Sequence, residues 1–254
     1  MSEIKIASYN IHRCYGTDGK YDPERIRRVL HQMDADIIVL QEVESRLHML
    51  SDANISPVQV SPYAVSESIS YHGELLDFLT DGSSWQYIEG PTLLREAGRY
   101  GNAILSSLPI KQHKLLDLSF KNREPRGAID LRLEYEHYQL RVIGTHLGLT
   151  PAERRYQTKK LLDWIGRPEK GKEEVTFLLG DLNEWYLWGK PLRWLRSWFG
   201  AAPSRASYPT CCPFFALDRI WVSPLSYIKQ VKIMRNSLTQ LASDHYPIIA
   251  TLDM

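Results

Sequence analysis

Residues 102–146 read NAILSSLPIKQHKLLDLSFKNREPRGAIDLRLEYEHYQLRVIGTH. This stretch contains four β-rich runs, at residues 102–107, 112–120, 127–135 and 139–146, and no segment with helical periodicity separates them. Parallel strands need a long crossover, usually a helix, between them, whereas antiparallel strands need only a turn. We therefore expect two mainly antiparallel sheets that pack face to face.

Strands and helices alternate on both sides of this stretch. Asp22 followed by Pro23 is typical of a helix start, and Thr150-Pro-Ala-Glu153 is a capping box that opens a helix ending near residue 165. Further elements are predicted as a short helix near 190–199 and as strands at 4–9, 36–41, 175–180, 218–223, 228–234 and 246–252. Because no linker or repeat divides the chain, we expect one α/β domain over residues 1–254, with helices outside each sheet.

The composition is typical of a globular protein with a balanced charge. The 254 residues include 31 Lys and Arg against 30 Asp and Glu, with 43% hydrophobic and 24% charged residues. These values exclude a disordered, collagenous or coiled-coil chain. A net charge of +1 also disfavours a protein that covers nucleic acid over its whole surface, but it leaves a local basic groove open.

The cysteines and the N-terminal residues indicate the compartment. Cys14, Cys211 and Cys212 are odd in number and two are adjacent, which is not a disulfide framework. The first ten residues, MSEIKIASYN, contain no apolar stretch like that of a signal peptide, and no apolar run approaches the ~18 residues of a membrane span. We expect a cytoplasmic monomer without a transmembrane segment.

Polar side chains lie at the ends of several predicted strands. They are Asn10 and His12, Gln41 and Glu42, Thr145 and His146, Asp181 and Asn183, and Asp244 and His245. Burying carboxylates is costly unless they are paired or bind a metal, so we expect these residues at one rim of the sandwich, where loops meet. Together they would form an oxygen-rich site with imidazoles available for proton or phosphate chemistry.

The types of side chain predict a hard divalent cation. Carboxylates and an amide occur without a Cys cluster or a His-x-x-x-His pair, which favours Mg²⁺ or Mn²⁺ over Zn²⁺. Glu42 and Asp244 are the candidate ligands. Asp181 and Asn183 are two residues apart in Gly-Asp-Leu-Asn and share a side if that segment is extended. Such a pair could hold a water, with the carboxylate accepting its proton and the amide fixing its orientation.

Seven short motifs occur in an order that resembles a known family. They are SYNIH at 8–12, LQEVE at 40–44, RYGNAILSS at 99–107, THLGL at 145–149, GDLNE at 180–184, LDRIWVS at 217–223 and SDHYPI at 243–248. Together they are similar to the endonuclease/exonuclease/phosphatase superfamily, which includes deoxyribonuclease I, abasic-site endonucleases, inositol polyphosphate 5-phosphatases and sphingomyelinases. The resemblance to its small bacterial members spans nearly the whole chain. It implies a four-layer αββα sandwich that hydrolyses phosphate esters with Mg²⁺, for which Mn²⁺ could substitute.

The resemblance implies a metal-binding and a water-activating role for five residues. Glu42 would bind Mg²⁺, helped by Asn10 and Asp244. Asp181 would activate the attacking water, and Asn183 would orient it. Charge stabilisation by the metal would then assist an in-line displacement at phosphorus.

A second set of residues would contact the phosphate. By the same resemblance, His245 would bind the phosphoryl group while Asp218 holds its other nitrogen, and His146 would contact the phosphate or assist the leaving oxygen. The remaining candidates for the phosphate pocket are Tyr100, Asn102 and Arg126, the last as a bidentate clamp. His12 stands where abasic-site endonucleases have an acid, so one or two metal ions both stay open.

Plainer interpretations exist for single residues. Glu42 could cap a helix near Ser45, Asn183 could be a turn residue, and Arg126 could pair with Glu124 at the surface. A non-catalytic module that only binds phosphate or lipid would be expected to have lost part of the machinery. The complete set favours an enzyme and comprises Glu42, Asp181, Asn183, Asp218, Asp244 and His245.

The tryptophan-rich segment, residues 185–205, concerns the substrate. It contains four of the seven Trp and four basic residues, and it has no acid. On a helical wheel from Lys190 the bases and the aromatic side chains separate, so a helix could simply dock on the sheet by its apolar face. It could instead contact the membrane at a phospholipid head group, or stack on nucleic acid. We expect a phosphodiester substrate, with a slight preference for a lipid or small phosphodiester and with DNA or RNA as the alternative.

Overall fold

The β-rich runs of residues 102–146 form strands that belong to both sheets of a sandwich. The structure is a computed structural model that describes residues 3–46, 74–95, 98–166 and 174–254. The five-stranded sheet has the order β5 (Ile110–Asp117), β6 (Gly127–Tyr135), β7 (Tyr138–His146), β8 (Glu174–Asp181) and β9 (Asp218–Ser223). The six-stranded sheet has the order β10 (Ile228–Ile233), β11 (Ile248–Asp253), β1 (Glu3–Asn10), β2 (Ile37–Arg46), β4 (Gly98–Ser106) and β3 (Gln86–Arg95).

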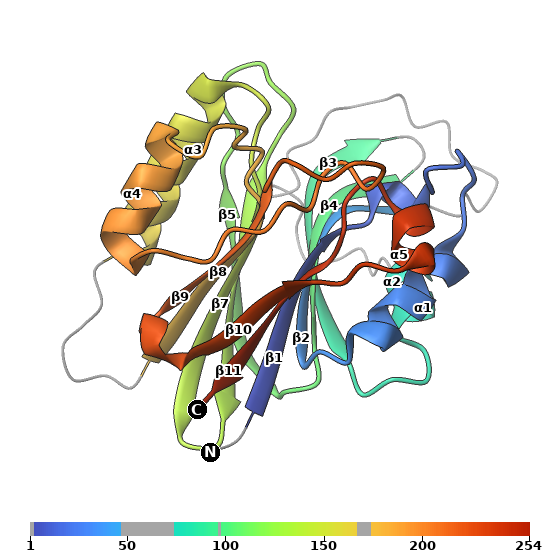
Figure 1. The fold of residues 1–254 in the computed structure, drawn as a ribbon, viewed down its shortest axis with the longest axis horizontal. Helices are drawn as coiled ribbons and strands as arrows, with labels where there is room; N and C mark the ends of the chain where they lie inside the picture. Colours follow the sequence, from blue (N-terminus) through green and yellow to red (C-terminus); the bar gives the residue numbers. More distant parts are fainter. Residues whose placement is uncertain (1–2, 47–73, 96–97, 167–173) are drawn as a thin grey trace.

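Helices cover the outer face of each sheet, so the chain has four layers (Figure 1). The six-stranded sheet is covered by α1 (Pro23–Met33), α2 (Glu74–Thr80) and α5 (Ser237–Ala242), and the five-stranded sheet by α3 (Pro151–Ile165) and α4 (Lys190–Phe199). Only the pairs β1–β2 and β7–β8 are parallel, and every other strand pair is antiparallel within the described ranges. The predicted fold class, a mainly antiparallel αββα sandwich, is confirmed.

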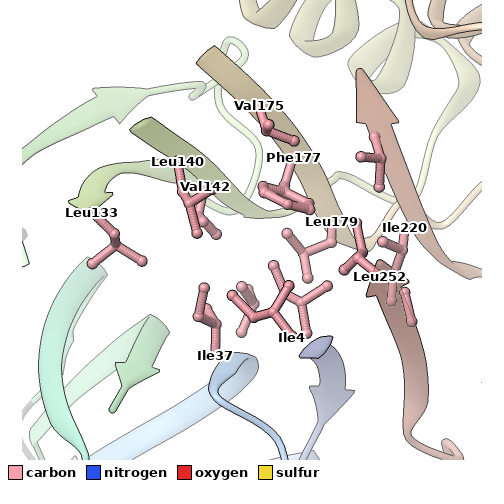
Figure 2. Close-up of a cluster of buried hydrophobic side chains, with 14 of the residues drawn as sticks. Ile4, Ile37, Leu133, Leu140, Val142, Val175, Phe177, Leu179, Ile220 and Leu252 are labelled. Atoms are coloured by element: carbon pink, nitrogen blue, oxygen red, sulfur yellow. The ribbon is translucent and has the colours of Figure 1, made fainter. Parts of the chain in front are cut away.

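Alternating side chains divide the core into three apolar layers. On β1, Ile4 and Ile6 point between the sheets, while Ala7 and Tyr9 point towards α1. Strand β8 shows the same alternation, because Phe177 joins the layer between the sheets (Figure 2) and Leu178 the layer under α3 and α4. Both sheets are therefore buried on two faces, which leaves the strand ends as the place where polar side chains can gather.

The strand register brings distant polar residues to one edge. On the three neighbouring strands β7, β8 and β9, His146 is level with Asp181, and Asp181 is level with Asp218. In the other sheet, the end of β1 places Asn10 level with Gln41 of β2. These strand ends lie at one end of the sandwich, and the start of β1 and the C-terminus lie at the other (Figure 1).

Several further features extend or limit the sequence predictions. The sequence did not predict α2, β3 or α5, and β2 continues past the predicted end at residue 41 to Arg46. Because the strand continues, the interpretation of Glu42 as the cap of a helix near Ser45 is wrong.

Cys14, Cys211 and Cys212 are free thiols. None of the helices in the described ranges has the length and apolarity that crossing a bilayer requires.

Candidate active site

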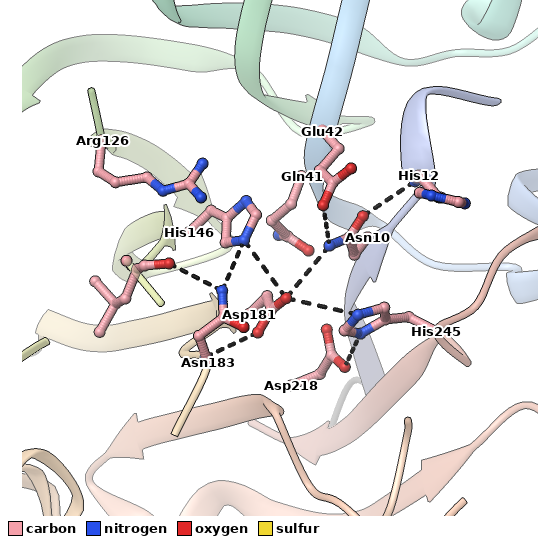
Figure 3. A network of polar contacts seen from close by, with 12 residues as sticks. Asn10, His12, Gln41, Glu42, Arg126, His146, Asp181, Asn183, Asp218 and His245 are labelled. Carbon is pink, nitrogen blue, oxygen red and sulfur yellow. Dashed lines mark hydrogen bonds and ion pairs between the residues drawn. The ribbon is translucent and has the colours of Figure 1, made fainter. Parts of the chain in front are cut away.

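A cavity of about 350 Å³ opens at this edge of the sandwich, between the ends of the two sheets. Its walls are built from the loops that follow β1, β7 and β8 and precede β11, and from Glu42 within β2. Figure 3 shows that side chains from both sheets converge on Asp181. Of the predicted site residues, eight line the cavity: Glu42, Tyr100, Arg126, His146, Asp181, Asn183, Asp244 and His245.

Asp181 is the buried carboxylate at the centre of the site. Its Oδ1 accepts a hydrogen bond from the backbone N–H of Asn183 at 2.8 Å, and its Oδ2 accepts one from Asn10 Nδ2 at 3.3 Å. The Nε2 atoms of His146 and His245 lie 3.5 and 3.7 Å from the same Oδ2. Burial raises the pKa of Asp181 to about 6 although His245 opposes that shift, so the carboxylate is ionised at neutral pH and still basic.

Glycine is required immediately before this carboxylate. Gly180 has φ +145°, and a Cβ there would lie 1.8 Å from the carbonyl oxygen of Thr145. The absence of a side chain therefore lets β7 and β8 approach closely where His146 and Asp181 leave the two strands. Asn183 has φ +48°, a left-handed conformation that turns the chain back and aims its N–H at Asp181.

His245 is held by a second buried carboxylate. Its Nδ1 donates to Asp218 Oδ2 at 2.8 Å, and the Ser207 hydroxyl donates to the same oxygen. Burial disfavours the imidazolium, but the carboxylates of Asp218 and Asp181 outweigh burial and raise the pKa of His245 to about 10. At neutral pH His245 is therefore a cation, with its Nε2–H facing Asp181 and the cavity.

His146, unlike His245, is neutral. Burial, with the positive charges of Arg126 and His245, holds the pKa of His146 well below its usual range. Asn183 Nδ2 donates to His146 Nε2 at 3.0 Å and to the carbonyl oxygen of Leu147 at 3.0 Å. The site therefore places a neutral and a charged imidazole on two sides of one carboxylate.

Glu42 reaches the cavity from a bulge in β2. The register with β4 shifts between Leu40 and Val43, and Glu42 itself has φ +58°. This conformation is strained for a non-glycine residue, and such strain is common where a side chain is re-aimed at a functional site. Glu42 Oε1 accepts a hydrogen bond from Asn10 Nδ2 at 3.1 Å, which links it to Asp181.

The carboxylates of Glu42 and Asp244 are suitable ligands for a hard cation. Both line the cavity, with side chains 20% and 36% exposed; Arg13 Nε lies 4.0 Å from Glu42, and His12 Nδ1 lies 3.9 Å from Asp244. A cation here would find oxygen donors and room for water, as Mg²⁺ requires. Asp181, Asp218 and His245 also form a compact buried group. In that group, Asp218 already occupies His245 Nδ1, which makes it the poorer metal site.

The remaining candidates separate into two kinds. Arg126 is buried, pairs with Glu124 at 2.7 Å, and still has an Nε with no hydrogen-bond partner in the described chain. It is thus a cation of the cavity wall rather than a surface ion pair. Tyr100 also lines the cavity, and burial raises the pKa of its phenol above the ordinary value. Asn102 is not among the lining residues, because its amide donates to the carbonyl of Gly127 at 3.1 Å and bridges the two sheets.

Sequence reasoning missed the residues that support the histidines and the wall. Ser207 holds Asp218, and the ring of Tyr208 lies 4.7 Å from that of His245. Trp185 stacks edge-on against Tyr208 and Phe215, with ring centroids 5.8 and 4.8 Å apart, and lines the cavity. The only sequence signal for these contacts was the tryptophan content of the segment after Asn183.

The tryptophan-rich segment has two structural parts. In α4, Leu192, Leu195 and Phe199 pack in the layer under the five-stranded sheet, so the interpretation of this helix as docked by its apolar face is correct. Trp198, near the end of the same helix, is also held in place, because its indole N–H donates to the carbonyl of Gly166 at 2.7 Å. The loop at 186–188, by contrast, is exposed.

Comparisons with known proteins concern the family and the fold of the chain. A model of the Endonuclease/Exonuclease/phosphatase family matches residues 7–245. The uncharacterized protein YbhP of Escherichia coli (strain K12) is 27% identical over 260 residues, covering 99% of this chain and 96% of its own.

Solved structures show the same fold at low identity. An endonuclease/exonuclease/phosphatase from Bacteroides vulgatus is similar with a TM-score of 0.71 at 15% identity, covering 100% of both chains. D. rerio TDP2 in complex with a single-strand DNA product is similar with a TM-score of 0.67 at 15% identity, again over 100% of both chains. At such identities the likeness establishes the fold.

Proposed function

The chain belongs to the endonuclease/exonuclease/phosphatase family, and from that premise we propose that it is a Mg²⁺-dependent phosphodiesterase whose substrate is a lipid or small phosphodiester. The observation that supports this most directly is the arrangement around Asp181. A buried carboxylate with a pKa of about 6 lies between a neutral and a cationic histidine and faces an open cavity. General-base catalysis at neutral pH requires a group of this kind.

Asp181 takes the proton from the attacking water in the proposed reaction. Asn183 fixes the carboxylate through its backbone N–H, and its side-chain oxygen, which accepts no hydrogen bond within the described ranges, is available to orient the water. The water oxygen forms a bond to phosphorus in line with the ester oxygen, whose bond to phosphorus breaks. The products are a phosphomonoester and an alcohol, whose oxygen takes a proton from solvent water as it leaves, while Asp181 returns its proton to solvent.

Cationic side chains stabilise the charge that develops on the phosphoryl oxygens. His245 presents its Nε2–H to the cavity and is kept protonated by Asp218. Arg126 brings a guanidinium charge to the wall of the same cavity, and the neutral His146 also lines it, where it would contact the phosphate or the leaving oxygen. Preorganised donors aimed at the developing charge are usually the largest contribution to catalysis of this type.

Glu42 and Asp244, with the side-chain oxygen of Asn10, would hold the metal. When bound, Mg²⁺ supplies Lewis-acid neutralisation of a phosphoryl oxygen. In this structure the Asn10 Nδ2 donates to Glu42 and Asp181 and its Oδ1 accepts from the His12 N–H at 3.0 Å, so the second lone pair of Oδ1 would serve the metal. Mn²⁺ has a similar preference for oxygen ligands and should substitute.

Hydrolysis of bis-p-nitrophenyl phosphate tests this proposal. The purified chain, stripped with EDTA, should be inactive and should recover with Mg²⁺ or Mn²⁺. Asp181→Asn should lower kcat by about 10²–10⁴-fold, whereas Asp163→Asn, at an exposed position of α3, should not change it. Full activity of Asp181→Asn would overturn the assigned role, and activity in EDTA would overturn the metal dependence.

A nuclease is the second candidate, and one observation favours it. Trp185 and Tyr208 present aromatic rings beside the catalytic cavity, where a base could stack. The similar TDP2 structure holds a single-strand DNA product. A panel of single-stranded DNA, plasmid DNA and phospholipid vesicles, each with Mg²⁺, separates the two candidates by kcat/KM. No turnover of any ester would favour a non-catalytic binding module.

A further inference from the structure

The most exposed apolar side chains of the described chain lie on loops that also contribute residues to the catalytic cavity. Only five large apolar side chains in the described ranges are more than half exposed: Leu149 (63%), Tyr186 (55%), Leu187 (51%), Trp188 (72%) and Phe214 (65%). We call these five residues the apolar rim. They come from three loops, after β7, after β8 and before β9, and Leu149 also lines the cavity. Exposed apolar residues concentrated in this way mark an interaction surface.

The apolar rim is supported from below by a packed aromatic cluster. Trp185, next to Tyr186 in the chain, packs edge-on against Phe215 with ring centroids 4.8 Å apart, and Phe215 lies 4.2 Å from Phe214. The rings of Tyr186 and Trp188 lie 5.6 Å apart. Two of the three loops are thus joined, so the rim is a built surface rather than a set of independent loop tips.

A basic cavity lies directly beside the rim. It has a volume of about 330 Å³, and Tyr186 and Trp188 form one wall. Arg155, Lys190 and Arg193 also line it, and none of the three forms an ion pair with the described residues. Arg154 and Glu184 also line this cavity and form an ion pair with each other, with Nε and Oε2 3.1 Å apart. The cavity therefore has a net positive lining suited to an anion.

The basic cavity and the catalytic cavity share the same loops. Asn183 and Trp185 line the catalytic cavity, while the alternating residues Glu184 and Tyr186 line the basic one. Where β7 connects to α3, Leu149 of the loop lines the first cavity and Pro151, the first residue of α3, lines the second. A partner that contacts the rim can therefore reach both cavities at once.

We propose that the apolar rim docks on an anionic phospholipid bilayer, with a lipid phosphate in the basic cavity and a neighbouring head group at the catalytic cavity. Two of the five rim residues are leucines, which offer no aromatic face for a nucleic-acid base, whereas Trp, Tyr and Leu next to basic residues are the composition of interfacial membrane contacts. Assignment of lipid as the substrate rests on the proposed function, but docking does not depend on catalysis.

Vesicle co-sedimentation tests the apolar part of the proposal. The full chain should sediment with vesicles of phosphatidylglycerol and phosphatidylcholine and much less with phosphatidylcholine alone. Leu187→Ser/Trp188→Ser should weaken this binding by about tenfold or more, because it removes the most exposed side chain of the rim, Trp188, together with its neighbour. The matched control is Phe78→Ser/Leu225→Ser, two apolar side chains of similar type that are 39% and 37% exposed away from the rim. Thermal unfolding shows whether each variant is folded.

Charge removal tests the electrostatic part. Lys190→Gln/Arg193→Gln should weaken binding to the anionic vesicles about fivefold per base removed. Binding of the wild type should also fall as salt is raised. Lys20→Gln/Arg28→Gln removes two exposed bases elsewhere and should leave binding unchanged. Equal loss in both double variants would indicate non-specific attraction and would overturn the proposal.

The same assay separates docking from catalysis. Asp181→Asn should bind the vesicles as the wild type does, so docking without hydrolysis of any ester would remove the proposed function and keep the rim. Wild-type sedimentation by Leu187→Ser/Trp188→Ser would overturn docking while leaving the hydrolase proposal intact. Binding of a single-stranded oligonucleotide, weakened by these variants in the absence of vesicle binding, would assign the rim to nucleic acid instead.

Discussion

Two buried carboxylates of the five-stranded sheet have opposite surroundings. Asp130, on β6, accepts hydrogen bonds from Arg141 Nε at 3.1 Å, from Arg141 Nη2 at 2.7 Å and from Trp164 Nε1 at 2.8 Å. Arg141 also donates to the carbonyl of Ile165 at 2.9 Å. At the end of β8, Asp181 Oδ2 has the cationic His245 Nε2 at 3.7 Å and the neutral His146 Nε2 at 3.5 Å.

This difference separates a structural ion pair from a reactive group. Asp130 and Arg141 pair in a forked geometry, so they hold β6, β7 and the end of α3 together and the charge of the carboxylate is compensated. The ionised form of Asp181 is poorly compensated, and burial raises its pKa to about 6. Because this pKa lies above the ordinary value, ionised Asp181 opposes folding increasingly as the pH rises from about 4 to about 6.

The largest expected effect is on activity and belongs to Asp181. Asp181→Asn should lower kcat by about 10²–10⁴-fold. Its free energy of unfolding at pH 7 should be unchanged or higher, because the variant removes a charge that the fold disfavours. Denaturant unfolding and steady-state kinetics on the same preparation measure both. A variant that lost stability as well as activity would show that Asp181 is a structural residue like Asp130.

The next effect is on stability and belongs to Arg141. Arg141→Met leaves the buried charge of Asp130 without its partner and should lower the free energy of unfolding by about 3–5 kcal/mol. The kcat of the folded fraction should not change, because the pair is not part of the cavity. Replacing both partners, Asp130→Leu/Arg141→Met, should recover much of the stability. If the double variant were as unstable as the single one, lost packing rather than an unpaired charge would be the cause.

A smaller effect is predicted for Asp218, which acts through His245. Asp218→Asn removes the carboxylate that most favours the imidazolium, so the pKa of His245 should fall from about 10. Activity should decrease by about 10–100-fold. The loss should be greater as the pH rises, because the variant loses the proton of His245 within the assay range. A pH–rate profile parallel to that of the wild type would show that Asp218 does not set the charge of His245.

Local signals explain which elements the sequence predicted. The bounds of α3 follow from its capping box, in which Glu153 Oε2 accepts from the Thr150 N–H at 2.9 Å and Thr150 Oγ1 accepts from the Glu153 N–H at 3.3 Å. Strand β3 was missed because Pro91 interrupts the pattern. The structure tolerates this proline because β3 is an edge strand with a register shift at that residue.

In the candidate site, the residues at strand ends could be predicted from the sequence, but those in the long loop could not. His146, Asp181 and Asp218 could be predicted to meet because strand ends and register bring them level. Ser207 and Tyr208 could not, since they lie in a long loop between α4 and β9 without periodicity, and only its packing against His245 gives them a role. The motif position of Asn102 predicted it in the phosphate pocket. In the structure its side chain donates to the carbonyl of Gly127 between the two sheets.

The smallest expected effect is on stability and belongs to Trp164, which donates a hydrogen bond to Asp130. Trp164→Phe removes one donor to Asp130, while Arg141 continues to satisfy the carboxylate. Trp164 is 37% exposed, so water can replace the indole N–H in part. The free energy of unfolding should fall by about 1 kcal/mol, which corresponds to a decrease in Tm of about 2–4 °C for a chain of this size. Thermal unfolding measures this change, and kcat should stay at the wild-type value. A decrease as large as that of Arg141→Met would mean that the indole, rather than the guanidinium, compensates the buried charge.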